Sequence, residues 1–258
     1  MTGSARRTVA AWGRTALLAG FTALVLVPIV SIVGQSLRGR GGAIDLIGFA
    51  QQAVSGPVLG WLLNSVVLSL ATVAVVLSVA APAGYVLARV QDRRVDAASL
   101  VLFAAQSLPV VLLLPPLFVL VAHAQGVDGR VWVGIVYVAV ASAVATWMLR
   151  AGFAALPVDA EEAAWLDGCG VFSAFVRIAL PNAVPALLSA GLFTFLLAWN
   201  DYWIALTFIQ DSGAFTVGLA LVSGGRTPAL TLVALLPPLI AFLALRRWFR
   251  FGGVPQSV

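Results

Sequence analysis

Long apolar stretches that are almost free of charged side chains constrain this chain more than any other feature. Six of them follow one another along the 258 residues, separated by short segments that carry most of the arginines and acids. An α-helix needs about 20 mostly apolar residues to cross the hydrocarbon core of a bilayer. Only 10% of the residues are charged, whereas soluble proteins carry about 25%. A soluble fold of this size could not bury so much apolar surface, so we predict an all-α integral membrane protein.

The apolar stretches define a single transmembrane domain over residues 16–250, between an N-terminal segment 1–15 and a tail 251–258. No small-x-small cleavage site follows the first stretch, so we expect a retained span and not a signal peptide. Three prolines inside the third stretch, the first of them Pro109, predict a kinked helix. The predicted spans are 16–36, 61–88, 98–122, 131–150, 182–209 and 228–246.

The arginines indicate the orientation of these spans, because basic residues are more frequent in cytoplasmic segments of membrane proteins. With the N-terminus inside, eleven arginines fall in cytoplasmic segments and four in external ones. Both termini and the segment 157–181 are therefore predicted to be cytoplasmic. The arginines flank apolar runs and do not gather into one patch, so we expect contact with membrane lipid and none with nucleic acid.

Residue types that are missing or rare exclude several kinds of chemistry. All fifteen basic residues are arginine, so the chain has no P-loop lysine to hold a nucleotide and no lysine for a Schiff base. A single histidine, His123, and a single cysteine, Cys169, cannot form a metal cluster or an intrachain disulfide. We therefore predict that the chain is not an enzyme and holds no metal or cofactor. If ATP drives it, a separate subunit must supply the ATPase.

Small residues recur at every fourth position in two of the predicted spans. Such ridges let helices approach closely in lipid, so we expect both to be packing surfaces. They consist of Ala80, Gly84 and Ala88 in the second span, and of Ala186, Ala190, Thr194 and Ala198 in the fifth.

The segment 157–181 is the one polar, patterned region in the second half of the chain. Pro157 suits the first turn of a helix, and the acids that follow it are favoured by the positive end of the helix dipole. Gly168 is placed to end that helix, and a second apolar segment leads to Pro181. These patterns predict two short helices lying along the cytoplasmic face. By themselves they fit a plain structural loop as well as a binding element.

The spacing within this segment resembles the EAA signature of ABC-importer permeases, the membrane subunits of binding-protein-dependent uptake systems. The signature reads E-A-A-x3-G-x9-I-x-L-P, and every fixed position is met. It also lies before the penultimate span, where that family has it. The matching residues are Glu162, Ala163, Ala164, Gly168, Ile178, Leu180 and Pro181.

Shorter stretches are similar to the carbohydrate branch of that family, the maltose-type permeases. Together with the EAA signature, the resemblance covers residues 10–254, although the tail pattern is compressed. The stretches are Asn64-Ser65, Ala83-Gly84-Tyr85 with Ala88-Arg89, Pro115-Pro116-Leu117-Phe118, Trp199-Asn200-Asp201, and Arg247-Trp248-Phe249 with Gly252-Gly253-Val254.

The resemblance implies a type I ABC-importer permease with six transmembrane helices and a cytoplasmic coupling helix, located in the bacterial inner membrane. Its implied partners are a second permease, two ATPase subunits that hold ATP and magnesium, and an extracytoplasmic solute-binding protein. The coupling helix would dock on one ATPase subunit, with Glu162 facing a polar partner. The coupling set comprises Glu161, Glu162, Ala163, Ala164, Gly168, Ile178, Leu180 and Pro181.

A substrate pathway is marked more weakly. Aromatic and polar side chains near the end of the fifth span would suit a sugar, whose C–H faces stack and whose hydroxyls need partners. An interfacial aromatic belt with an inter-subunit hydrogen bond explains the same residues. The candidates are Asn64, Trp199, Asn200, Asp201 and Tyr202.

Two other functions stay open beside carbohydrate import. A permease of the same family could carry a polyamine, phosphate or another small solute. An ion-coupled secondary transporter would need buried acids, and Asp201 is the one candidate at membrane depth. An intramembrane enzyme would need a motif such as His-Glu-x-x-His or Gly-x-Ser-x-Gly, and neither occurs.

Overall fold

The structure is entirely helical over the residues that it describes. The computed structural model describes residues 3–38, 45–54, 56–90, 92–123, 126–223 and 228–249, and every regular element in these ranges is a helix. This confirms the predicted all-α class. Among the described residues, four helices are long and apolar enough to cross a membrane, and a bent pair makes a fifth. Six separate spans were predicted, so the fold departs from the prediction at two of them.

Four predicted spans correspond to single long helices. A short helix, α2 (Leu46–Ala53), occupies the loop between the first two of them, and the Asp45 carboxylate caps it by accepting a hydrogen bond from the Gly48 N–H. The first helix already begins at residue 3, so it includes most of the predicted N-terminal segment 1–15. The predicted tail 251–258 lies outside the described residues. The long helices are α1 (Gly3–Ser36), α3 (Gly56–Arg89), α6 (Gly129–Ala154) and α13 (Pro228–Phe249).

The predicted third span, 98–122, is divided into two helices. The first, α4, covers Arg93–Gln106, and the second, α5, covers Val110–Ala122. Pro109 precedes α5 in an extended conformation, with ψ of 113°. Proline cannot donate the helical hydrogen bond and disfavours helix in the residue before it, so the helix stops here. The two later prolines, Pro115 and Pro116, lie inside α5 without ending it.

The predicted fifth span, 182–209, is also interrupted. After the short helices α8 (Val171–Ala174), a π-helical turn (Phe175–Ala179) and α9 (Leu180–Asn182), the chain bends by 76° into α10 (Val184–Asn200). At Asp201 the backbone becomes extended, and α11 (Trp203–Phe208), a 3-10 turn (Ser212–Ala214) and α12 (Val217–Ser223) follow.

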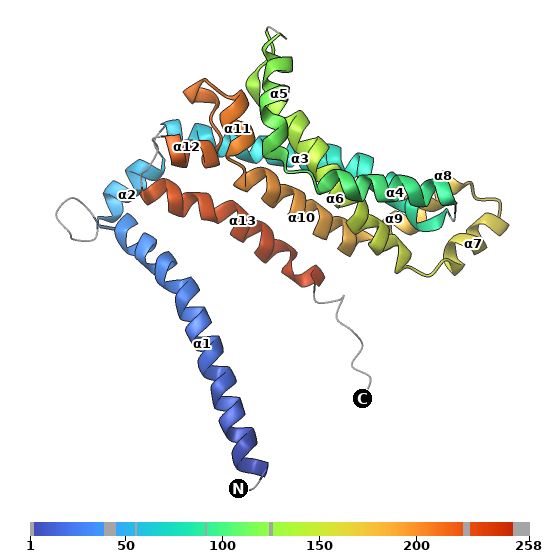
Figure 1. Ribbon diagram of the computed structural model, residues 1–258, viewed down its shortest axis with the longest axis horizontal. Coiled ribbons are helices and arrows are strands. Elements are labelled where there is room, and N and C mark those ends of the chain that lie inside the picture. Colours follow the sequence, from blue (N-terminus) through green and yellow to red (C-terminus); the bar gives the residue numbers. More distant parts are fainter. Residues whose placement is uncertain are drawn as a thin grey trace.

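The core lies where α3, α6 and α10 run side by side (Figure 1). Both predicted small-residue ridges are packing surfaces in this core. A Cβ on Gly84 of α3 would lie 2.9 Å from the backbone nitrogen of Arg150 on α6, so the two helices cross at close range there. In the second ridge, Ala190, Thr194 and Ala198 of α10 are buried. Close approach of backbones through small residues is how helices associate in lipid.

The bundle has two ends of different character (Figure 1). The helix α7 (Asp159–Leu166) and α8 lie at one end, which we call the α7 end. The helices α5, α11 and α12 lie at the other, which we call the α12 end. The first helix, α1, extends away from the bundle near α2, and its apolar window has no buried residue. An apolar helix without protein cover fits a lipid environment.

Candidate functional site

The α7 end carries the residues of the EAA signature. The helix α7 begins at Asp159, two residues after Pro157, and covers 8 residues. Gly168 follows it with φ of +83°, a conformation that favours glycine. The Cys169 N–H donates to the Ala164 carbonyl at 2.9 Å, and the Gly168 N–H donates to the Trp165 carbonyl at 3.0 Å. This is a Schellman motif, so Gly168 ends the helix as predicted.

Two neighbouring acids of α7 differ sharply in their exposure to solvent. The Glu162 side chain is exposed, together with Ala163. Leu166 at the end of the helix is 90% exposed, and Phe172 of α8 is 78% exposed. The Glu161 side chain, in contrast, is only 1% exposed and points into the bundle. An acidic residue and several apolar side chains are thus exposed on α7 and α8. We call them the docking surface, after the role that we propose for them below: Glu162, Ala163, Leu166, Val171 and Phe172.

Both oxygens of the buried Glu161 carboxylate accept hydrogen bonds from side chains at the end of α3. Its Oε1 accepts a hydrogen bond from Arg89 Nη2 at 2.7 Å, and its Oε2 accepts one from Tyr85 Oη at 2.7 Å. Arg89 Nη2 also lies 3.4 Å from the Leu156 carbonyl, in the linker before α7. Sequence reasoning did not pair these residues. The signal was an arginine that ends a span and a glutamate in the first turn of a cytoplasmic helix.

The later signature residues lie against the core. Ile178 and Leu180 are half-buried and Pro181 is exposed, on the π-helical turn and α9. Leu180 packs on the core cluster of α3, α6 and α10. Beside them, the Phe175 ring lies 4.9 Å from the Tyr85 ring, centroid to centroid. This half of the signature thus lies on the chain that connects α7 to the bundle.

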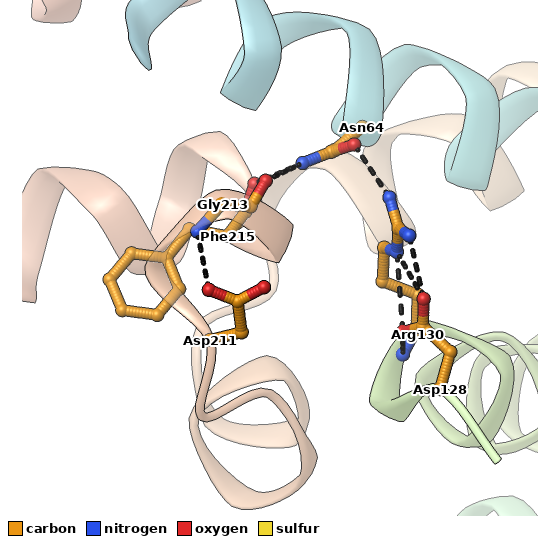
Figure 2. Close-up of polar contacts among 6 residues, drawn as sticks. All are labelled: Asn64, Asp128, Arg130, Asp211, Gly213 and Phe215. Atoms are coloured by element: carbon orange, nitrogen blue, oxygen red, sulfur yellow. Dashed lines mark hydrogen bonds and ion pairs between the residues drawn. The ribbon is translucent and has the colours of Figure 1, made fainter. Parts of the chain in front are cut away.

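At the α12 end, the Asn64 side chain of α3 makes hydrogen bonds to two other segments of the chain (Figure 2). Its Nδ2 donates to the carbonyls of Gly213 and Phe215 at 3.0 and 3.1 Å, and its Oδ1 accepts from Arg130 Nη1 at 3.0 Å. The sequence marks Asn64 as a substrate candidate. In the structure its side-chain amide makes hydrogen bonds to other residues of the same chain.

Arg130 is itself held by Asp128, the residue that caps α6. The Arg130 Nη2 lies 2.6 Å from Asp128 Oδ2, and the Arg130 backbone N–H donates to Asp128 Oδ1. The side-chain hydrogen bonds from Arg130, and then the backbone one, hold the pKa of the Asp128 carboxyl below its usual range. These two residues and Asp211 line an open cavity of about 420 Å³.

Two more side chains of α3 hold the same segment of the α12 end. Trp61 Nε1 donates to the Ser212 carbonyl at 2.9 Å, and Ser65 Oγ accepts from the Val217 N–H at 2.7 Å. Three residues on one face of α3 thus bind the backbone of residues 212–217, which we call the mouth segment.

The remaining substrate candidates lie at the end of α10. Trp199 is buried and donates to the Ala234 carbonyl at 3.1 Å. Asp201 accepts from Tyr137 Oη at 3.0 Å and from the backbone N–H groups of Ile204 and Ala205. Asn200 is exposed, and Tyr202 packs edge-on against Trp203. The structure therefore brings Asp201 together with α6 and α11, while Asn64 lies in a separate hydrogen-bond network.

A family comparison identifies what kind of chain this is. A model of the family described as "Binding-protein-dependent transport system inner membrane component" matches residues 80–250. The chain belongs to this family. It is therefore a membrane permease of the ABC-importer type, and the permease is not itself an enzyme. Among the described residues, no three His, Cys, Asp or Glu side chains gather where they could hold a metal ion.

Individual relatives of the permease agree with this assignment. A putative ABC transporter permease protein of Streptomyces antibioticus is 31% identical over 81% of this chain and 93% of its own length. A diacetylchitobiose uptake system permease protein of Streptomyces coelicolor is 27% identical over 94% of this chain and 86% of its own. A bacterial ABC transporter that imports the polysaccharide alginate matches the fold with a TM-score of 0.78 and 18% identity, over 96% of this chain and 99% of that one.

Proposed function

We propose that the permease forms part of the membrane pathway of an ABC importer for a carbohydrate, which an extracytoplasmic binding protein delivers. A second permease completes the pathway, and two separate ATPase subunits supply ATP and magnesium. The relatives support a carbohydrate, because their names refer to diacetylchitobiose uptake and to alginate import. The arginine distribution supports cytoplasmic termini and a cytoplasmic α7 end.

The observation that carries the proposal is the docking surface. Large apolar side chains and the Glu162 carboxylate are exposed together on α7 and α8, where Leu166 is 90% exposed. At a cytoplasmic position these side chains face water, and an exposed apolar group rimmed by polar residues marks an interaction site. A groove on an ATPase subunit with a basic residue opposite Glu162 would cover this surface. The small Ala163 allows its backbone to approach closely.

The substrate pathway is proposed at the α12 end. Asn200 and Tyr202 lie at the end of α10 with side chains that are exposed or half-buried, so a sugar can reach them. The side chains of Asn64, Trp199 and Asp201 already make hydrogen bonds to other residues of this chain. We assign to these three the role of shaping the pathway, and to Asn200 and Tyr202 direct contact with the solute.

Reconstitution of the complete transporter in proteoliposomes tests the proposed function. The permease is co-expressed with its neighbouring transporter subunits, and uptake is measured with labelled oligosaccharides, polyamines and phosphate. We expect ATP-dependent uptake of an oligosaccharide that requires the binding protein. ATP-dependent uptake of a polyamine or of phosphate alone would replace the carbohydrate. Uptake driven by an ion gradient without any ATPase subunit would overturn the importer proposal.

A further inference from the structure

Glu161 ties the helix α7 to the end of α3. The carboxylate is 1% exposed and the Arg89 side chain is 11% exposed, so the pair is shielded from water. Tyr85, one turn earlier on α3, donates to the second carboxylate oxygen at 2.7 Å. Hydrogen bonds to ionised groups are about twice as strong as neutral ones. We call this arrangement of Tyr85, Arg89 and Glu161 the latch.

The latch attaches α7 to the bundle in addition to its two chain connections. Residues 155–158 connect α6 to α7, and residues 167–170 connect α7 to α8. The latch joins α7 to α3 as well, and Arg89 also reaches the Leu156 carbonyl in the segment before α7. A helix held in this way cannot turn without moving the elements that hold it. A displacement of α7 is therefore passed to α3.

The other end of α3 holds the mouth segment. The helix is continuous over 34 residues, through Pro82, which corresponds to about 50 Å at 1.5 Å per residue. At its first turns, Trp61, Asn64 and Ser65 bind the backbone of residues 212–217. One helix thus has a buried charged contact with α7 at one end and a set of hydrogen bonds to the mouth segment at the other.

We propose that the latch transmits a displacement of α7 to α3, and that α3 transmits it to the mouth segment. Glu161 is then a positioning residue for transport, and Glu162 belongs to the docking surface. This inference rests on the proposed function, because it needs an ATPase subunit that moves α7. It adds that neighbouring glutamates have separate tasks: Glu162 binds the moving partner, and Glu161 transmits the movement.

The experiment uses the assembled transporter in proteoliposomes, with Cys169→Ser as background because Cys169 is the one cysteine of the chain. Ser212→Cys places a thiol at an exposed position of the mouth segment, and its labelling by a membrane-impermeant maleimide is compared with and without ATP. Glu161→Gln removes the charge of the latch, and Tyr85→Phe removes only one hydroxyl. Asp96→Asn is the matched control, since it breaks the exposed ion pair with Arg150 and does not touch α7.

We expect Glu161→Gln to keep the ATPase subunits bound while uptake per ATP falls about tenfold, within the usual range of coupling energies. The ATP-dependent change in labelling should disappear at the same time. Tyr85→Phe should give a smaller loss of both, and Asp96→Asn none. If Glu161→Gln and Tyr85→Phe keep normal uptake per ATP and the labelling change, the latch is overturned.

A second comparison separates the latch from the proposed function. If the folded Glu161→Gln and Tyr85→Phe variants no longer bind the ATPase subunits, Glu161 and Tyr85 are needed for ATPase binding. That result would also overturn the proposal that the latch transmits movement. Glu162→Lys is expected to lose the ATPase subunits on co-purification. If it retains them with normal uptake, the docking surface itself is wrong, whatever the Glu161 variants show.

Discussion

The Tyr137 hydroxyl donates a hydrogen bond of 3.0 Å to Asp201 Oδ2, which joins α6 to the break after α10. The same carboxylate accepts from the Ile204 and Ala205 N–H groups and so caps α11. Tyr137 is fully buried. The contact therefore fixes where α10 ends and how α11 turns back against α6.

Tyr137→Phe should destabilise the permease, because it removes the hydroxyl and leaves Asp201 with one donor fewer. A hydrogen bond to a charged group contributes about 1.5–3 kcal/mol. The loss is measured as a lower midpoint of unfolding for the purified protein. Tyr202→Phe serves as the control, since the Tyr202 ring packs against Trp203 by its edge and Phe retains that contact. Equal midpoints for the two variants would contradict the assigned role of Tyr137.

Asp201→Asn should weaken the cap of α11 and leave recognition of the solute unchanged. The amide can still accept from one backbone N–H, but it loses the charge that strengthens these bonds. We expect a lower unfolding midpoint with an unchanged KM for uptake. A raised KM with an unchanged midpoint would instead place Asp201 in direct contact with the solute.

Gly84→Ala should destabilise the crossing of α3 and α6. Its added Cβ would lie 2.9 Å from both the backbone nitrogen of Arg150 and the Leu149 Cβ, and overpacking of this kind costs about 1–3 kcal/mol. Gly60→Ala on the same helix is the matched control, because a Cβ there meets nothing within 4 Å. That change should raise stability slightly, by about 0.4–1 kcal/mol. Unfolding midpoints of the two variants should thus shift in opposite directions.

Glu162→Lys should leave membrane insertion intact and abolish transport-coupled ATP hydrolysis. The side chain is exposed, so its replacement costs little folding energy, while the reversed charge repels a basic partner. Membrane fractionation checks insertion, and hydrolysis by the reconstituted complex checks coupling. Normal coupled hydrolysis in this variant would remove Glu162 from the docking surface.

Gly168→Ala should disturb the end of α7, whereas Gly170→Ala should not. A Cβ at either position meets nothing within 4 Å, but only Gly168 has a positive φ, of +83°. A residue with a side chain pays about 1–2 kcal/mol in that conformation. We expect the Gly168 variant to lose most of its uptake at an unchanged level of inserted protein. Equal uptake for the two variants would show that the Schellman turn is not needed.

The hydropathy pattern predicted most of the long helices, because length and apolar composition alone decide whether a helix can cross a bilayer. The small-residue ridge around Gly84 was likewise correct, since close helix packing depends on local side-chain size. In the third span a kink was predicted, whereas the helix is divided before Pro109, and the break at Asp201 was missed. Pro115 and Pro116 stay inside α5 while Pro109 precedes it, so proline by itself does not say where a helix in lipid stops.

The two adjacent acids of α7 separate what the sequence determined from what the tertiary structure decided. The sequence by itself determined that Glu161 and Glu162 stand in the first turn of a short helix, which Gly168 ends. Neighbouring residues point about 100° apart around a helix, yet nothing in the sequence says which direction faces the bundle. The packing of α7 beside the last turn of α3 decided it. Arg89 and Tyr85, 72 and 76 residues away in the chain, compensate the buried charge of Glu161, and Glu162 is left exposed for a partner.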